Sequence, residues 1–272
     1  MRLISKLYQK YRRTPAPSPA APVELDLGVA LRDSMTRGWL NAETGELFTN
    51  FPVGPQDIVA DIGCGDGGNA RFCASRGARL ILADIDEGIV ARAAARVAAE
   101  PHCAGVEVHV TDSDPLPIAS NIASKVVCTE VIEHVEDPAR LMAELFRIGR
   151  PGARYLIACP DPASEMIQKR VADPSYFERP NHIRIIQHAE LDRYVEAAGL
   201  IIEGRYSHGF YGSMWWALFW AANVPLDKPD HPLLESWAQT WRLLLDQPNG
   251  AAVKHALDDL RPMSQVVIAR KP

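Results

Sequence analysis

The sequence predicts an α/β protein built on a seven-stranded, mostly parallel sheet with helices on both faces. Three observations lead to this fold class. An apolar run from Ile58 ends in Asp61 and leads into a glycine-rich turn, as a first strand does before a nucleotide-binding loop. Segments typical of strands and helices then alternate. An acid stands at the end of each of the first four strands, at Asp61, Asp84, Asp112 and Glu130. Since ligands of such sheets bind outside the carboxyl ends of the strands, these acids predict the site.

The individual elements follow from apolar runs and turn residues. A helical lead-in is expected at about 25–39 and a turn at about 41–45. Strands are expected at about 57–62, 79–84, 106–110, 126–130, 153–159, 200–206 and 265–270. Helices are expected at about 67–76, 87–99, 137–148 and 187–198. Gly199 is the expected end of the last helix, because glycine adopts the left-handed conformation that often terminates helices.

Composition indicates an ordinary globular chain. With 272 residues, 47% hydrophobic and 23% charged, it is long enough for one large α/β domain. The five cysteines are odd in number and contain no Cys-x-x-Cys pair, which favours reduced thiols in a cytoplasm over disulfides or zinc. No signal peptide is recognisable, and the net charge of −5 argues against a nucleic-acid partner.

The first 22 residues differ from the rest. Residues 1–13 hold five basic side chains and no acid, with apolar residues on one helical face, and 14–22 form a proline-rich linker. Residues 23–272, after this linker, are the expected main domain. Residues 1–13 are interpreted as a contact to an anionic membrane surface, which would place the protein peripherally at the inner membrane face. The alternatives are a helix docked on its own acidic domain and a frayed tail.

The glycine-rich loop alone is ambiguous. Gly63, Gly65 and Gly68, with Asp84 about 20 residues on, also satisfy the fingerprint of nicotinamide-dependent oxidoreductases. However, a carboxylate at Asp61, two residues before the first glycine, would repel a pyrophosphate and suits a ligand with an ammonium group.

With this Asp-x-Gly-x-Gly order, the chain resembles the class I S-adenosylmethionine (SAM)-dependent methyltransferases, and the resemblance extends over residues 52–206. The likeness continues in the strand end at 80–86, in Val-Thr-Asp-Ser at 110–113, in the strand and turn at 126–135, and in the Arg-Pro-Gly start at 150–152. The resemblance implies a Rossmann-like fold and SAM as cofactor, with Asp84 on the ribose hydroxyls and Asp112 at the adenine. It assigns cofactor binding to residues of these motifs: Asp61, Gly63, Cys64, Gly65, Asp84, Ile85, Asp112, Ser113 and Glu130.

Two histidines are the candidate general bases, because methylation of a hydroxyl requires a base with a pKa near neutral. His134 follows the fourth strand, and His182 lies in the loop after the fifth. The alternative for His134 is a turn or cap residue that shapes the pocket floor. Tyr176 and Arg184 are candidate acceptor contacts, or else loop packing and a surface charge. The linear spacing shows no His/Cys/Asp cluster typical of metal ligands, so no catalytic metal is expected.

Roughly 58 residues, 207–264, stand where the resembled fold has a short hairpin connection, so this insertion must carry its own structure. Its first part is nearly uncharged and includes Trp215 and Trp216, and a second helical stretch follows at 233–246. We consider a helical hairpin packed on the domain, a homodimer interface, a lid over an apolar acceptor contacted by both tryptophans, and an interfacial patch.

The sequence therefore predicts a SAM-dependent methyltransferase acting on a small-molecule, glycan or lipid-linked acceptor, with oxygen as the expected methyl acceptor. Quinone-type members of the family share the Glu-His turn at 133–134. Two other functions remain open on the sequence alone: a nicotinamide-dependent oxidoreductase, and a non-catalytic methyltransferase-like scaffold.

Overall fold

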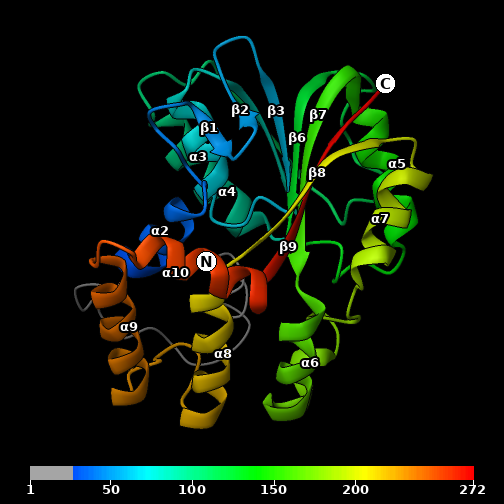
Figure 1. Ribbon diagram of the computed structural model, residues 1–272. Helices are drawn as coiled ribbons and strands as arrows, with labels where there is room; N and C mark the ends of the chain where they lie inside the picture. The colour runs from blue at the N-terminus through cyan, green and yellow to red at the C-terminus, as the bar shows by residue number, and fades with distance from the viewer. Residues whose placement is uncertain (1–26) are drawn as a thin grey trace.

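The computed structural model describes residues 27–272, in which seven strands form one sheet in the order β5-β4-β3-β6-β7-β9-β8 (Figure 1). Six strands run parallel to one another and β9 runs antiparallel between β7 and β8. The seven strands are β3 (Ile58–Ile62), β4 (Arg79–Asp84), β5 (Val106–Val110), β6 (Ala123–Thr129), β7 (Gly149–Pro160), β8 (Ile201–His208) and β9 (Ser264–Arg270). The predicted fold class and all seven predicted strands are confirmed.

Helices cover both faces of the sheet, as predicted. The helices are α2 (Leu27–Thr36), α3 (Gly68–Ser75), α4 (Glu87–Ala98), α5 (Pro138–Ile148), α6 (Pro162–Val171), α7 (His188–Ala197), α8 (Phe210–Ala222), α9 (Pro232–Leu245) and α10 (Gly250–Leu260). One apolar core joins α5 and α7 to the sheet, and a second joins α3 and α4 to the opposite face. In β3, Ala60 and Ile62 belong to the first core and Val59 to the second, since neighbouring strand residues point to opposite faces.

Side-chain caps and left-handed glycines set the helix ends near the sheet. Asp86 accepts a hydrogen bond from the Ile89 amide at the start of α4, and Asp137 does the same for Arg140 at the start of α5. Gly199 has a φ of +90° directly after α7, as predicted for the residue that ends this helix.

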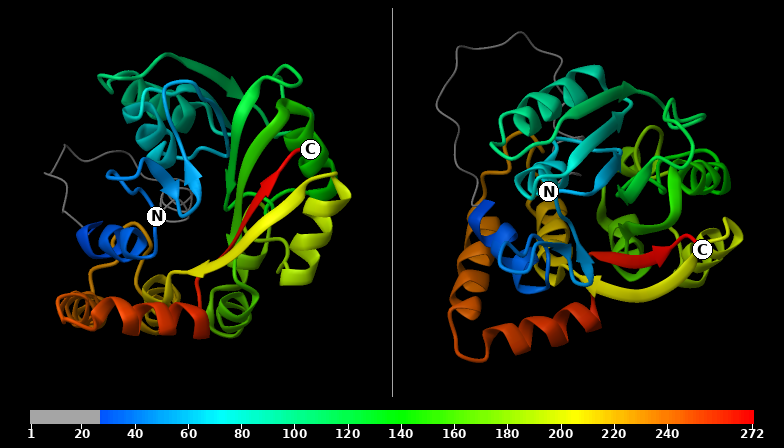
Figure 2. Two further views of the ribbon diagram at one scale, coloured as in Figure 1. Left: turned by 45° about the horizontal axis from the view of Figure 1, so that its top comes forward. Right: turned by 90° about the horizontal axis from the view of Figure 1, so that it is seen from above.

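The insertion between β8 and β9 folds as three helices, α8, α9 and α10, of which the sequence predicted the first two. Figures 1 and 2 show these helices gathered with α2 and α6 beyond the carboxyl ends of the parallel strands. Trp216 and Trp241 are buried within the protein itself, as expected for an insertion that packs on its own domain. Among residues 27–272, no helix has both the length and the apolar character needed to cross a bilayer. The basic segment at 1–13 and the linker at 14–22 lie outside the described residues.

Several elements escaped the sequence prediction. These are α6, the 3-10 turn η1 (Pro174–Phe177), α10, and a small hairpin of β1 (Glu46–Phe48) and β2 (Phe51–Pro52). Helix α10 escaped prediction because the side that it buries is not apolar. Its buried residues are Gly250, Lys254 and Asp258, which recur every four residues but give no hydrophobic pattern.

A buried charge network joins this insertion to the domain. The Lys254 ammonium lies 2.5 Å from an Asp258 oxygen and 3.1 Å from an Asp33 oxygen, and all three side chains are almost fully buried. Asp33, on α2, also accepts a hydrogen bond from the Trp241 indole, and Asp258 accepts from the Phe210 amide at the start of α8. The network therefore connects α2, α8, α9 and α10.

We expect Lys254→Met to lower the free energy of unfolding by about 3–5 kcal/mol, because the buried Asp33 would lose its counter-charge and the buried Asp258 would keep only the Arg37 guanidinium, 3.8 Å away. Urea denaturation measures this change. The exposed Lys228→Met is the matched control, with an expected effect within about 0.5 kcal/mol. Equal stability of the two variants would show that the network does not hold the insertion in place.

Candidate functional site

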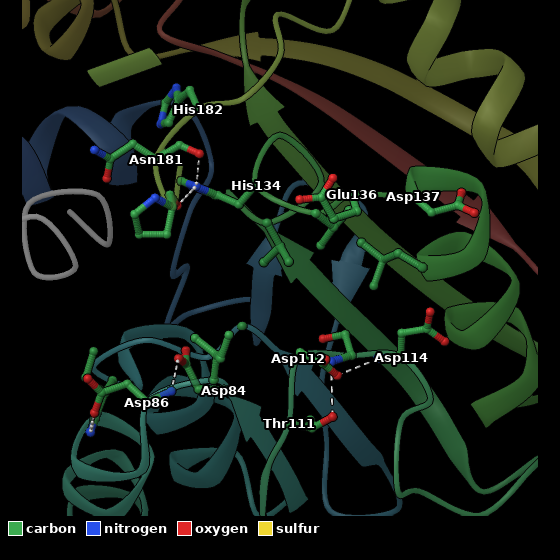
Figure 3. Close-up of a pocket in the computed structure, with 18 residues that line it drawn as sticks. Asp84, Asp86, Thr111, Asp112, Asp114, His134, Glu136, Asp137, Asn181 and His182 are labelled. Atoms are coloured by element: carbon green, nitrogen blue, oxygen red, sulfur yellow. Dashed lines mark hydrogen bonds between the residues drawn. The ribbon is translucent and has the colours of Figure 1, made fainter. Parts of the chain in front are cut away.

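A cavity of about 590 Å³ opens at the carboxyl ends of β3, β4 and β6. Of the residues that the sequence assigned to the site, seven line it: Gly63, Asp84, Ile85, Asp112, Ser113, His134 and His182. In Figure 3, Asp84 and Asp112 lie along one side and His134 along the other. The cavity thus joins the strand-end acids to the two candidate histidines, as expected of a site at this edge.

Asp84 holds the glycine-rich loop in place. One of its carboxylate oxygens accepts a hydrogen bond from the Gly65 amide at 2.9 Å, and the other accepts from the Asp86 amide at 3.2 Å. Gly63 has a φ of +67°, and a Cβ there would lie 2.2 Å from Cγ2 of Val131. Only glycine therefore allows the loop to approach the turn after β6 so closely. Asp61 and Cys64 are fully buried and do not line the cavity.

A second cavity of about 190 Å³ lies on the other side of the turn after β6. Its walls combine the glycine-rich loop with α2, α6 and α8, and include Trp39, Glu130, Tyr176, Trp216 and Met263. The turn divides the two cavities, because Glu130 lines the second and its neighbour Val131 lines the first. Tyr176 and Trp216, two of the candidate acceptor contacts, thus line the same cavity. Arg184 and Trp215 line neither cavity, since Arg184 donates to the Glu136 carbonyl and Trp215 stacks on Phe219.

The two histidines meet edge to face, with ring centroids 4.9 Å apart. Nδ1 of His134 lies 2.9 Å from the Asn181 carbonyl oxygen and 3.1 Å from that of Pro180. Nδ1 of His182 lies 2.8 Å from a carboxylate oxygen of Glu165. Because all these partners are acceptors, Nδ1 is the donor in each ring, and Nε2 carries the lone pair in the neutral form.

Glu165 is a site residue that the sequence did not indicate. It projects from α6, an element that was not predicted, and it is 3% exposed. Besides its contact with His182, it accepts a hydrogen bond from the Tyr176 hydroxyl at 3.3 Å. Burial, followed by the charge of Glu165, raises the pKa of Tyr176, so this phenol stays neutral and remains a donor.

Negative charge is concentrated around the turn after β6. Burial and the neighbouring Glu133 carboxylate raise the pKa of Glu130 to about 8. Burial also acts to raise the pKa of Glu133, but the imidazoles of His134 and His182 outweigh it and hold that pKa below its ordinary value. Nε2 of His134 lies 3.3 Å from a carboxylate oxygen of Glu133.

Glu133, His134 and His182 form a group that could hold a metal ion. Each offers one ligand atom, and these three atoms lie within 4.8 Å of one another. The linear spacing that the sequence analysis considered does not reveal this group, because 47 residues separate His182 from the Glu-His pair and the fold alone brings them together.

The raised pKa of Glu130 predicts a pH dependence of stability. In the unfolded chain this carboxyl ionises near its ordinary pKa, whereas in the folded protein it keeps its proton up to about pH 8. The folded state therefore loses stability as the pH rises from about 5 to 8. Relative to the wild type, Glu130→Gln should gain stability across this range in urea denaturation with a chelator present. The exposed Glu196→Gln should show no such trend, and a pH-independent difference for Glu130→Gln would contradict the assignment.

Comparison with known proteins agrees with this geometry. Residues 60–157 match the family model described as a methyltransferase domain. A probable S-adenosylmethionine-dependent methyltransferase of Mycolicibacterium smegmatis is 32% identical over 145 residues, which cover 53% of this chain and 52% of the relative. A ubiquinone biosynthesis O-methyltransferase of Aeromonas salmonicida is 30% identical over 173 residues, which cover 60% of this chain and 68% of the relative. The chain thus spans about half the length of the first relative.

Solved structures support the same fold. A methyltransferase-like protein from Bacillus halodurans superposes with a TM-score of 0.55 at 18% identity, covering 81% of this chain and 94% of that one. A geranyl diphosphate methyltransferase gives a TM-score of 0.54 at 18% identity, covering 81% of this chain and 73% of that one. Together with the strand order, the glycine-rich loop and the strand-end acids, these matches decide against a nicotinamide-dependent enzyme: the chain belongs to the class I SAM-dependent methyltransferases.

Proposed function

We propose that the protein transfers the methyl group of SAM to a hydroxyl of a small, largely apolar acceptor. The observation that carries this proposal is the pair of cavities divided by the turn after β6. One cavity presents the strand-end acids of the family, and the other is lined by aromatic side chains. A reaction between a polar cofactor and an apolar acceptor requires two such compartments that meet at the reacting atoms.

The larger cavity is assigned to SAM. We assign the two ribose hydroxyls to the Asp84 carboxylate, and the adenine to Asp112 and Ser113, because all three residues line this cavity. The exposed side chain of Ile85 offers an apolar surface for the adenosine. Asp61, buried beneath the loop, is assigned a supporting role for the loop in place of the direct contact expected from the sequence.

The smaller cavity is assigned to the acceptor. Tyr176, Trp216 and Trp39 provide flat apolar walls suited to a ring or an unsaturated chain, and Glu130 provides a polar group at the side facing the turn. The relative from Aeromonas salmonicida is an O-methyltransferase by name, which supports oxygen as the methyl acceptor here.

The chemistry requires alignment and removal of one proton. The acceptor oxygen forms a bond to the methyl carbon while the carbon–sulfur bond breaks and its electron pair stays on sulfur, leaving a neutral thioether. The hydroxyl proton must leave before or during this step. We assign activation of the hydroxyl to His134 and His182, which line the larger cavity and whose Nδ1 atoms are engaged by acceptors, leaving Nε2 for this role.

Transfer of labelled methyl from SAM tests the function. A panel of catechols and phenols would be compared with the fully methylated ether of each compound, which matches its shape but lacks the hydroxyl. We expect label in the hydroxyl compounds and none in their ethers. Label found only on nitrogen or carbon would overturn O-methylation, and SAM binding without transfer to any acceptor would favour the non-catalytic scaffold.

We expect Asp84→Ala to weaken SAM binding by about 2–3 kcal/mol, roughly 30- to 150-fold, through loss of charge-assisted hydrogen bonds. Isothermal titration with SAM measures the change. Asp84→Asn retains an oxygen for the Gly65 amide and separates loss of charge from loss of the loop contact. The exposed Asp227→Ala is the control, and an unchanged affinity in Asp84→Ala would rule out this residue as a ribose ligand.

A further inference from the structure

We propose that Glu133, His134 and His182 bind a divalent transition-metal ion at the wall of the larger cavity, with coordination positions left for an oxygen of the acceptor. The binding of the ion follows from these residues alone. Only the part about the acceptor oxygen rests on the proposed function.

The first argument is the orientation of the two imidazoles. His134 is fixed by backbone carbonyl oxygens at its Nδ1, and His182 is fixed by the Glu165 carboxylate at its Nδ1. A histidine that ligates a metal usually donates its other ring nitrogen to a carbonyl or carboxylate, which sets the tautomer and the direction of the ligating atom. Both histidines here have that arrangement.

The second argument is the state of Glu133. This side chain is 1% exposed, and among residues 27–272 neither of its carboxylate oxygens receives a hydrogen bond of ordinary geometry. A buried carboxylate without donors is costly unless a cation lies beside it. Nε2 of His134 lies 3.3 Å from a Glu133 oxygen, and among residues 27–272 it also lacks a hydrogen-bond partner of ordinary geometry. A metal ion bound between the two side chains would supply the positive charge that this buried carboxylate needs.

The third argument is convergence. The three ligand atoms lie within 4.8 Å of one another, although they come from the turn after β6 and from the loop after η1. The loop is fixed at several points: the His182 amide donates to the Tyr176 carbonyl, and the Ile183 amide donates to the Glu133 carbonyl. The ligands are therefore held by rigid structure on both sides, as a binding site requires.

The ligand set indicates the class of ion. Two imidazoles with one carboxylate suit zinc, iron, cobalt and manganese, whereas magnesium and calcium prefer all-oxygen sites. Three protein ligands leave at least one position open. With the ion bound, the two histidines would activate the hydroxyl through the metal and would not take its proton themselves. An acceptor hydroxyl bound at the open position would give up its proton to water more readily, and its oxygen would then take the methyl group from sulfur. Glu165 is the positioning residue of this site, since it acts through His182.

Binding of Co²⁺ to the full-length, chelator-treated protein tests the site in the absence of SAM and acceptor. Visible absorption reports the coordination of Co²⁺, and titration gives its affinity. We expect one Co²⁺ per chain, a loss of affinity of about 100-fold or more in His134→Ala, and a loss of about 10- to 100-fold in Glu165→Gln. His134 reaches the surface, so its replacement tests the site even if the buried Glu133→Gln does not fold.

The matched control is His188→Ala. His188 also pairs with a carboxylate, Asp161, but it is largely exposed and outside the group, so Co²⁺ affinity should equal that of the wild type. Failure of the wild type to bind Co²⁺, or equal affinity in wild type and His134→Ala, overturns the site. Methyl transfer to hydroxyl compounds by metal-free protein, with no gain on adding Co²⁺, would overturn the metal while leaving the proposed function intact. Co²⁺ binding without any methyl transfer would support the metal site and overturn the proposed function.

Discussion

The constraint on which this structure depends is the negative charge buried at one edge of the sheet. Asp84, Glu133 and Glu165 are almost fully buried there, and Glu130 lines the cavity beside them. Each needs a partner, because buried carboxylates repel one another and lose hydration. Asp84 has backbone amides, Glu165 has an imidazole and a phenol, and Glu130 has the Ser264 hydroxyl. Among residues 27–272, the side chain of Glu133 contacts His134 but receives no hydrogen bond of ordinary geometry. The edge is therefore suited to cationic ligands, among them a sulfonium and a metal ion.

The elements outside the sheet give this edge its apolar compartment. Trp216 comes from α8, Glu165 from α6 and Leu31 from α2, and all three line the smaller cavity. The buried Lys254 network joins α2 to the insertion, while α6 follows β7 and is linked to α8 by the hydrogen bond between the Ser164 and Ser213 hydroxyls. The smaller cavity thus depends partly on buried polar contacts between helices, whereas the larger cavity is formed mainly at the ends of the strands.

The sequence predicted the sheet, the glycine-rich loop and seven of the described helices, because these follow from apolar periodicity and from glycines with acids at strand ends. It did not predict α10, whose buried side is polar, or the role of Glu165, which lies in a helix without a clear apolar stripe. Spacing along the sequence could not reveal that His182 lies beside Glu133 and His134, because only the tertiary fold brings these residues together. Local patterns identify the cofactor site, but residues brought together from distant segments require coordinates.

The turn after β6 explains how one short segment can serve both cavities. Glu130 adopts a φ of +57°, a left-handed conformation that costs a non-glycine residue energy and is often found at functional sites. At this bend of the backbone, Glu130 lines the smaller cavity and Val131 lines the larger one, while Glu133 and His134 follow on the turn. Gly63 then lets Val131 pack against the glycine-rich loop without a Cβ in the way. The strain at Glu130 is thus the local cost of a turn that lines both cavities and carries Glu133 and His134.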